Sequence, residues 1–190
     1  MIKTLTSVAA ALLLLAGTAH ASTVVTVDAL ADSWNSGTGT GLDTGIALTS
    51  GESFTVAVAA DDLWSAGALP RWSNANGLTA ATFATGSDES GEPAGTQIGA
   101  DFGLLDGFYY GELVGQIDNG AYFAVGTDFN GTANATGTLK LFYWDTYTPD
   151  NSGSVAATVS VVPEPGSMAL VLAGLGIVGG LSRRRARNAS

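Results

Sequence analysis

The 190-residue chain contains no cysteine and a single histidine, His20. Without thiols, the exported protein has no disulfides, so its stability depends on its hydrophobic core or on bound metal. Because His20 lies in an N-terminal segment that we expect to be removed, the mature protein can build neither a Ser-His-Asp site nor a histidine-bound zinc site. A glycosidase with paired carboxylates stays open, but no Asp or Glu spacing stands out, and we expect no enzyme.

Positive charge is also scarce. Between Ser22 and Val162, sixteen acidic residues stand against two basic residues, Arg71 and Lys140, which leaves a net charge of about −14. Nucleic acid and anionic lipid are poor partners for such a segment, whereas cations and neutral sugars are better candidates. Its length is typical of one domain, so we expect a single ectodomain at 22–162.

The N-terminus has the three parts of a secretory signal peptide. A basic residue precedes an apolar stretch from Val8 to Gly17, and the following Ala19-His20-Ala21 fits the small-residue rule for signal peptidase. We therefore expect residues 1–21 to form an N-terminal signal helix, with cleavage between Ala21 and Ser22.

The C-terminal residues 163–190 place a proline-bracketed motif, an apolar run and a basic cluster in one order. The run from Met168 to Leu181, extended by its small neighbours, spans about 25 Å as a helix. This is slightly short of a ~30 Å hydrocarbon core, a mismatch that membranes tolerate, so we expect a transmembrane helix. Four arginines keep its far end cytoplasmic and place the ectodomain outside the inner membrane. They are Arg183, Arg184, Arg185 and Arg187.

This order of features resembles the PEP-CTERM sorting signal of bacteria, with Pro163, Glu164 and Pro165 as its motif. The resemblance implies recognition by an exosortase, cleavage near the motif, and delivery to the cell surface or extracellular matrix. The residues agree with it, because two prolines exclude a helix and hold Glu164 extended, as a protease requires. The alternative is a permanent single-pass anchor with a stiff stalk.

The ectodomain shows short alternating runs separated by Gly, Asn, Asp, Ser and Thr, and no helical period. This pattern predicts an all-β, jelly-roll-type β-sandwich. From Trp64 to Asp106 the alternation weakens, and we expect a long loop region that carries specificity. Trp64 and Trp72 in that region either pack in the core or stack on a sugar. The clearest strands are expected at Thr23–Val27, Gly41–Leu48, Ser53–Ala59, Gly111–Ile117, Tyr122–Gly126, Gly137–Asp145 and Ser154–Val162.

One loop near the end of the ectodomain has calcium-type chemistry. Asp145, Asp150 and Asn151 gather three hard oxygen side chains between the last two strands, and calcium prefers such ligands. A solvated Asx turn explains the same residues, since Pro149 to Gly153 has ideal turn composition. Composition alone leaves both interpretations open.

A second resemblance bears on that choice. The expected hairpin from Thr44 to Val56, the two tryptophans, the strand at 111–117 and the loop ending at Val155 occur in the order seen in LecA-like lectins, a galactophilic calcium-dependent family. It implies a jelly-roll sandwich in which one calcium ion coordinates sugar hydroxyls. Carried over, the metal ligands are the side chains of Asp145, Asp150 and Asn151, the carbonyl of Leu48, and a carbonyl from Tyr147 or Thr148. Asp145, Trp64 and Trp72 become the ligand-binding residues.

Two functions follow as expectations. The first is an exported surface or matrix protein, sorted through an exosortase, whose domain binds extracellular polysaccharide through calcium. The second is a structural or adhesive biofilm-matrix protein in which calcium at most stabilises the fold and no sugar binds.

Overall fold

The computed structural model describes residues 21–68, 70–162 and 174–176. Two 3-10 helices, η1 (Asn35–Gly37) and η2 (Thr148–Asp150), interrupt the loops, and residues 174–176 are helical. Within these ranges no helix is both long and apolar enough to cross a membrane. The expected signal helix and most of the expected transmembrane helix fall outside the described residues.

The strands are β1 (Ala21–Asp28), β2 (Leu42–Leu48), β3 (Ser53–Val58), β4 (Trp64–Ala66), β5 (Trp72–Ser73), β6 (Thr82–Phe83), β7 (Gln97–Gly99), β8 (Leu104–Leu105), β9 (Phe108–Tyr109), β10 (Leu113–Ile117), β11 (Phe123–Ala124), β12 (Asp128–Thr132), β13 (Gly137–Tyr143) and β14 (Asn151–Val162).

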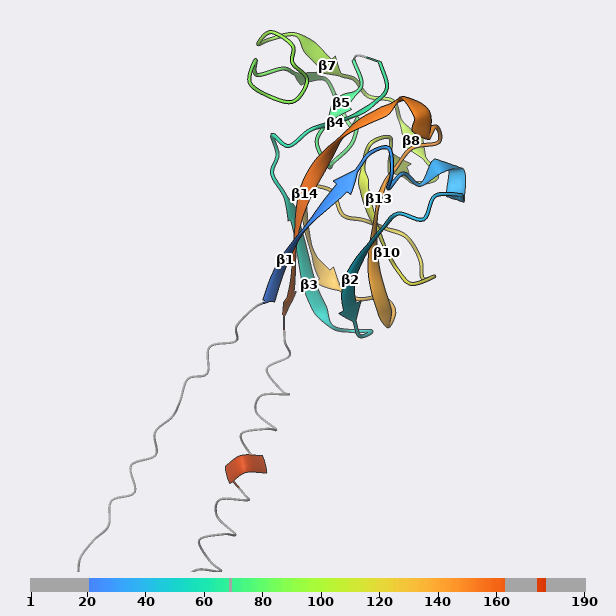
Figure 1. Cartoon of the computed structure of the whole chain (residues 1–190), viewed down its shortest axis with the longest axis vertical. Coiled ribbons are helices and arrows are strands. Elements are labelled where there is room, and N and C mark those ends of the chain that lie inside the picture. Colours follow the sequence, from blue (N-terminus) through green and yellow to red (C-terminus); the bar gives the residue numbers. More distant parts are fainter. Residues whose placement is uncertain (1–20, 69, 163–173, 177–190) are drawn as a thin grey trace, which may run out of the picture.

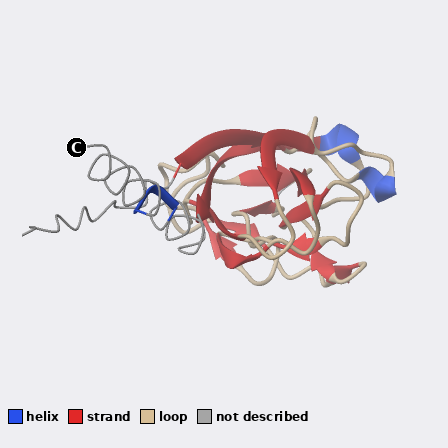
Figure 2. Cartoon of the chain, turned by 90° about the horizontal axis from the view of Figure 1, so that it is seen from below, coloured by secondary structure: helices blue, strands red, loops and turns tan. Residues whose placement is uncertain are grey.

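Most of the strands form two antiparallel layers (Figure 1), and β6-β7 and β8-β9 form two further two-stranded sheets. One sheet has the order β12-β3-β14-β4-β5, with β1 paired to β14, and the other has the order β11-β10-β13-β2. Figure 2 shows that strands make up nearly all of the regular structure. The predicted all-β sandwich class is confirmed.

The core lies between the two sheets and follows the alternation read from the sequence. The outward positions of β3 are more exposed, as expected for a strand with one buried face. Burying each large apolar side chain contributes about 1.5–3 kcal/mol, which is how a chain without disulfides keeps this fold. The alternate positions on one face of each of these two strands are all buried: Phe54, Val56 and Val58 in β3, and Leu139, Leu141 and Tyr143 in β13.

The turn predicted between β2 and β3 is present, but the expected hairpin is wrong. The N–H of Glu52 donates to the Thr49 carbonyl at 2.8 Å, and Gly51 adopts a φ of +89° that suits glycine. However, β2 pairs with β13, whereas β3 pairs with β12 and β14. The turn therefore crosses from one sheet to the other, because each strand satisfies its backbone with a different partner.

The expected loop region from Trp64 to Asp106 also needs correction. Ser65 in β4 lies opposite Trp72 in β5, and β4 pairs with the beginning of β14, so part of this region extends the larger sheet. Strands of two or three residues are too short to show a period-2 pattern, which is why the sequence did not reveal them.

Strand β14 runs the length of the domain. Residues 151–153 pair with β4, residues 157–162 pair with β3, and Ala21 at the start of β1 lies opposite Val161. Twelve residues of strand span about 36 Å at ~3.3 Å per residue. The two strands that lead to the chain termini thus end together at one end of the sandwich, and β4 and β5 lie at the other (Figure 1).

Candidate functional site

The candidate site is built by the loop between β13 and β14. After Tyr143 the chain leaves the sheet, turns through η2, and re-enters the sheet at Asn151. The proline of η2 stands in its first turn, where a missing N–H costs nothing, and the Asn151 N–H donates to the Thr148 carbonyl. This tight turn brings Asp145, Asp150 and Asn151 to one end of the sandwich.

Asp145 is a buried carboxylate, only 5% exposed. Its Oδ1 accepts a hydrogen bond from the Thr146 N–H at 2.6 Å. Burial raises the pKa of Asp145, the negative charge of Asp150 raises it further, and hydrogen bonds from Thr146, Tyr147 and Asn151 lower it. Desolvation is the largest of these effects, so burial disfavours the ionised carboxylate more than its hydrogen bonds favour it.

Asn151 is 6% exposed and carries an unsatisfied oxygen. Its Nδ2 donates to the Ala29 carbonyl at 3.2 Å, whereas Oδ1 is buried without a hydrogen-bond partner among the described residues. The Thr148 hydroxyl in the same turn is also buried and, within the described ranges, unpaired. Leaving a buried acceptor unpaired costs about 1–3 kcal/mol, so each of these oxygens can accept a further hydrogen bond or coordinate a cation.

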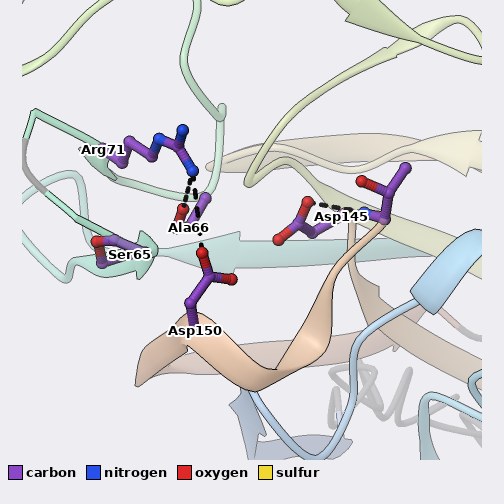
Figure 3. Close-up of polar contacts among 7 residues, drawn as sticks. Ser65, Ala66, Arg71, Asp145 and Asp150 are labelled. Atoms are coloured by element: carbon purple, nitrogen blue, oxygen red, sulfur yellow. Dashed lines mark hydrogen bonds and ion pairs between the residues drawn. The ribbon is translucent and has the colours of Figure 1, made fainter.

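Asp150 is the accessible carboxylate of the site. Its Oδ2 lies 3.9 Å from Nη1 of Arg71, and both side chains are about 40% exposed (40% and 42%). Such an exposed pair contributes only about 0–1 kcal/mol, so it does not commit Asp150 to Arg71. Gly67, at a φ of +97°, lies against the carboxylate so closely that a Cβ there would clash with it. Figure 3 shows Arg71 reaching Ala66 and Asp150 across the site from Asp145.

Asp145 and Asp150 line one pocket of about 270 Å³, whereas Asn151 and Thr148 lie near these residues in the chain and are not part of its lining. The charged groups Asp145, Asp150 and Arg71 share it with the rings of Phe102, Tyr110 and Tyr147. Phe102 is 43% exposed and Tyr147 is 60% exposed, so aromatic surface is available at the opening. The pocket thus combines hard oxygens at depth with exposed rings, a mixture that suits a polar, flat-faced ligand.

The structure does not bring Leu48 to this pocket, and its assignment to the same ion is wrong. Leu48 pairs with Gly137 at the beginning of β13, whereas Asp145 follows the end of that strand. The six residue steps along β13 place Leu48 and Asp145 about 20 Å apart. Calcium lies only ~2.3–2.6 Å from each oxygen that coordinates it, so one ion cannot bind both residues. The error arose because the turn after Leu48 crosses between sheets.

Trp64 is a core residue, which corrects its assignment to ligand binding. Its side chain is fully buried (0% exposed), its Nε1 donates to the Gly111 carbonyl at 2.9 Å, and its ring packs edge-on against Tyr143. Trp72 is half-buried against a small cluster of Leu63, Ala84 and Ile98 and does not line the pocket. The aromatic surface comes instead from Phe102, Tyr110 and Tyr147.

Sequence reasoning missed most of the residues that line the pocket. Arg71 had a detectable signal, because it is one of two basic residues in the ectodomain, and Tyr147 lies inside the predicted loop. Phe102 and Tyr110 gave no signal, since distant loops bring them in. The described residues contain no cluster of three or more His, Cys, Asp or Glu side chains that would hold a metal. A calcium ion here would rest on two carboxylates plus amide and carbonyl oxygens, a set that calcium accepts.

Residues 161–186 match the family described as the PEP-CTERM protein-sorting motif. The chain carries a PEP-CTERM sorting motif. The match includes Pro163, Glu164 and Pro165 and the first three arginines of the basic cluster, and Arg187 lies just beyond it. This sorting motif implies export, exosortase processing and sorting to the cell surface. It begins at Val161, so the last two residues of β14 belong to it and no linker separates it from the sandwich.

Among solved structures, the chain is similar to one described as the N-terminal domain of EclA, a PllA-like lectin. The identity is 22%, the TM-score is 0.47, and the match covers 73% of this chain and 95% of that chain. That similarity assigns no ligand to the pocket. No curated protein matches the chain.

Proposed function

We propose that the sorted ectodomain binds carbohydrate at the cell surface or in the extracellular matrix through a calcium ion held in the pocket. The observation that carries the proposal is that one loop holds both a buried carboxylate, Asp145, and a buried amide oxygen of Asn151 that has no partner among the described residues. Both groups gain a partner if a hard cation lies between them and Asp150.

The protein would supply part of a calcium shell. Asp145 and Asp150 contribute carboxylate oxygens and Asn151 its amide oxygen. The Thr148 carbonyl accepts one hydrogen bond from Asn151 and keeps a second lone pair. Calcium takes six to eight oxygens, so the protein leaves positions that water or sugar hydroxyls fill.

The ligand side of the pocket suits a sugar ring. The exposed rings of Phe102 and Tyr147 offer flat apolar faces beside the hydroxyl-binding cation. The pocket also lies about one strand length from the sorting motif, since Asn151 begins β14 and the motif begins near its end. Anchoring through the C-terminus therefore leaves the pocket free to meet extracellular polysaccharide.

Two titrations of the exported ectodomain, residues 22–162, test the proposal. Isothermal titration with calcium should show one site, and a glycan array should show binding that a chelator abolishes. Asp145→Asn should remove both signals, and Asp128→Asn on exposed β12 is a control with the same change in charge. Absence of calcium uptake by the wild-type ectodomain would refute the proposal.

The second candidate is a structural or adhesive matrix protein with a stabilising calcium ion. The deep burial of Asp145 and Asn151 favours it, because an ion there ties the β13–β14 loop to the Ala29 backbone. It predicts a melting temperature that falls with chelator, in a protein that binds no glycan. Chelator-sensitive stability together with glycan binding would leave the first function in place.

Processing is tested separately by intact mass spectrometry of the exported protein. We expect a chain that starts at Ser22 and has lost the residues after the Pro163–Pro165 motif. An intact C-terminus would show that the tail is a permanent anchor.

A further inference from the structure

Arg71 is an unexpected component of this pocket. The ectodomain carries only Arg71 and Lys140 as basic residues against sixteen acidic ones. Lys140 lies mid-strand in β13, opposite Gln116 and Asp43, and does not line the pocket. One of two cationic side chains therefore lies beside the two carboxylates proposed to hold calcium.

The guanidinium of Arg71 is positioned from three sides. Nη1 donates to the Ala66 carbonyl at 3.1 Å and lies 3.9 Å from Oδ2 of Asp150, and the guanidinium carbon is 5.1 Å from the centre of the Phe102 ring. These contacts restrict the side chain before any ligand arrives. A guanidinium has five N–H donors, and the single hydrogen bond within the described residues leaves most of them free for a ligand in the pocket.

The charges of the pocket change sign when a divalent cation binds. Asp145 and Asp150 with Arg71 sum to a single negative charge, and adding Ca²⁺ turns this into a single positive charge. An anionic ligand is repelled by the first arrangement and attracted by the second. A planar carboxylate also matches the paired N–H donors of arginine, which a neutral hydroxyl does not.

We infer that Arg71 makes the pocket selective for saccharides that carry a carboxylate, namely uronic acids, over their neutral counterparts. This inference rests on the proposed calcium-dependent sugar binding and names its ligand class. In the complex, calcium would coordinate ring hydroxyls while Arg71 receives the carboxylate from the Phe102 side of the pocket.

Matched sugars test this selectivity. Galacturonic acid and galactose differ only at C6, and both are titrated into the calcium-saturated ectodomain, with glucuronic acid and glucose as a second pair. We expect the acidic sugar of at least one pair to bind about tenfold more tightly than its neutral partner, as a charge-assisted bidentate contact provides. Equal affinity within both pairs would overturn the inference.

Two substitutions separate a direct contact from a general charge effect. Arg71→Gln should bring the affinity ratio near one without weakening calcium binding, because it also frees Asp150 from its ion pair. Lys140→Gln changes the net charge equally and should leave the ratio intact. Arg71→Lys keeps the charge but loses the paired donors, so an intermediate ratio is expected. Equal effects of Arg71→Gln and Lys140→Gln would refute the assignment to Arg71.

The outcomes also separate this inference from the proposed function. Neutral and acidic sugars that bind equally well remove only the role of Arg71. If calcium binds and neither sugar of either pair binds, the inference fails, and the glycan array decides the carbohydrate function separately.

Discussion

Strand β14 begins and ends in two different environments. At its end, regular pairing with β1 and β3 continues into the first residues of the sorting motif. At its beginning, Asn151 leaves the β13–β14 loop with a buried oxygen that no described residue satisfies, beside a carboxylate whose pKa burial raises. Sheet pairing satisfies the backbone in the first environment, whereas in the second a side-chain oxygen is left free for the proposed ligand. We therefore place stability and sorting at one end and binding at the other.

The largest effect should come from the regular core. Phe54→Ala removes a ring that is 1% exposed and packs against Phe123 and Phe129, so the free energy of unfolding should fall by about 3–5 kcal/mol. Val24→Ala, at a side chain 64% exposed on β1, should change it by less than about 0.5 kcal/mol. Chemical denaturation measures both, and a small loss for Phe54→Ala would contradict the placement of the core.

The next effect concerns the binding end. Asp145→Asn keeps the shape of the side chain but removes a charged ligand, and calcium affinity should fall by about 100-fold, because ligand charge sets affinity at such sites. Calorimetric titration measures the loss. In the absence of calcium the variant should be at least as stable as wild type, since it no longer buries an ionised carboxylate. A large loss of stability without calcium would indicate that Asp145 is purely structural.

A glycine pair tests how Asp150 is positioned. Gly67→Ala adds a Cβ that clashes with the Asp150 carboxylate and should weaken calcium binding about tenfold, or ~1.4 kcal/mol. Gly51→Ala has a similar positive φ of +89° but open space around it, so it should show only the backbone cost of about 1–2 kcal/mol in stability. Equal calcium affinities for the two variants would show that Asp150 is not a ligand.

The smallest effect concerns Glu112, near the binding end. It is 8% exposed, burial raises its pKa above the ordinary value of 4.5, and its Oε2 accepts the Tyr109 N–H at 2.7 Å. Because the folded pKa is raised, its contribution to stability is complete below pH 4.5 and is lost as pH rises through the folded pKa. Glu112→Gln should therefore gain up to about 1 kcal/mol over wild type at pH 7, and the gain should vanish near pH 4. Denaturation at both pH values measures the difference, and a pH-independent difference would contradict this account.

The parts of the fold that sequence predicted were those with enough residues to show a period. Alternation in β3 and β13 identified the buried faces, and Gly51 marked the turn before β3. The partners of those strands were not predictable, because alternation says which face is buried but not which strand lies alongside. That gap produced the expected hairpin, whereas the assignment of Leu48 was carried over from the resemblance to LecA-like lectins.

The residues of the candidate site also divide into those that the sequence could predict and those that it could not. Asp145, Asp150 and Asn151 were found because they lie within one short loop, where spacing alone brings them together. Arg71, Phe102 and Tyr110 come from other loops, and only their convergence on the pocket identifies them. Trp64 is an error of the opposite kind. Its aromatic ring suited a sugar-binding site, so it was predicted to bind ligand, but the structure buries it in the core.

The sequence by itself determined the sorting motif, the absence of histidine and thiol chemistry from the ectodomain, and the choice of strands over helices, because these depend on residue type and on contiguous order. Only the tertiary structure decided that the Leu48 carbonyl lies far from the pocket, that Trp64 is a core residue, and that a rare arginine shares a pocket with two carboxylates. Those features depend on contacts between residues distant in the chain, and local pattern carries no information about which distant residues meet.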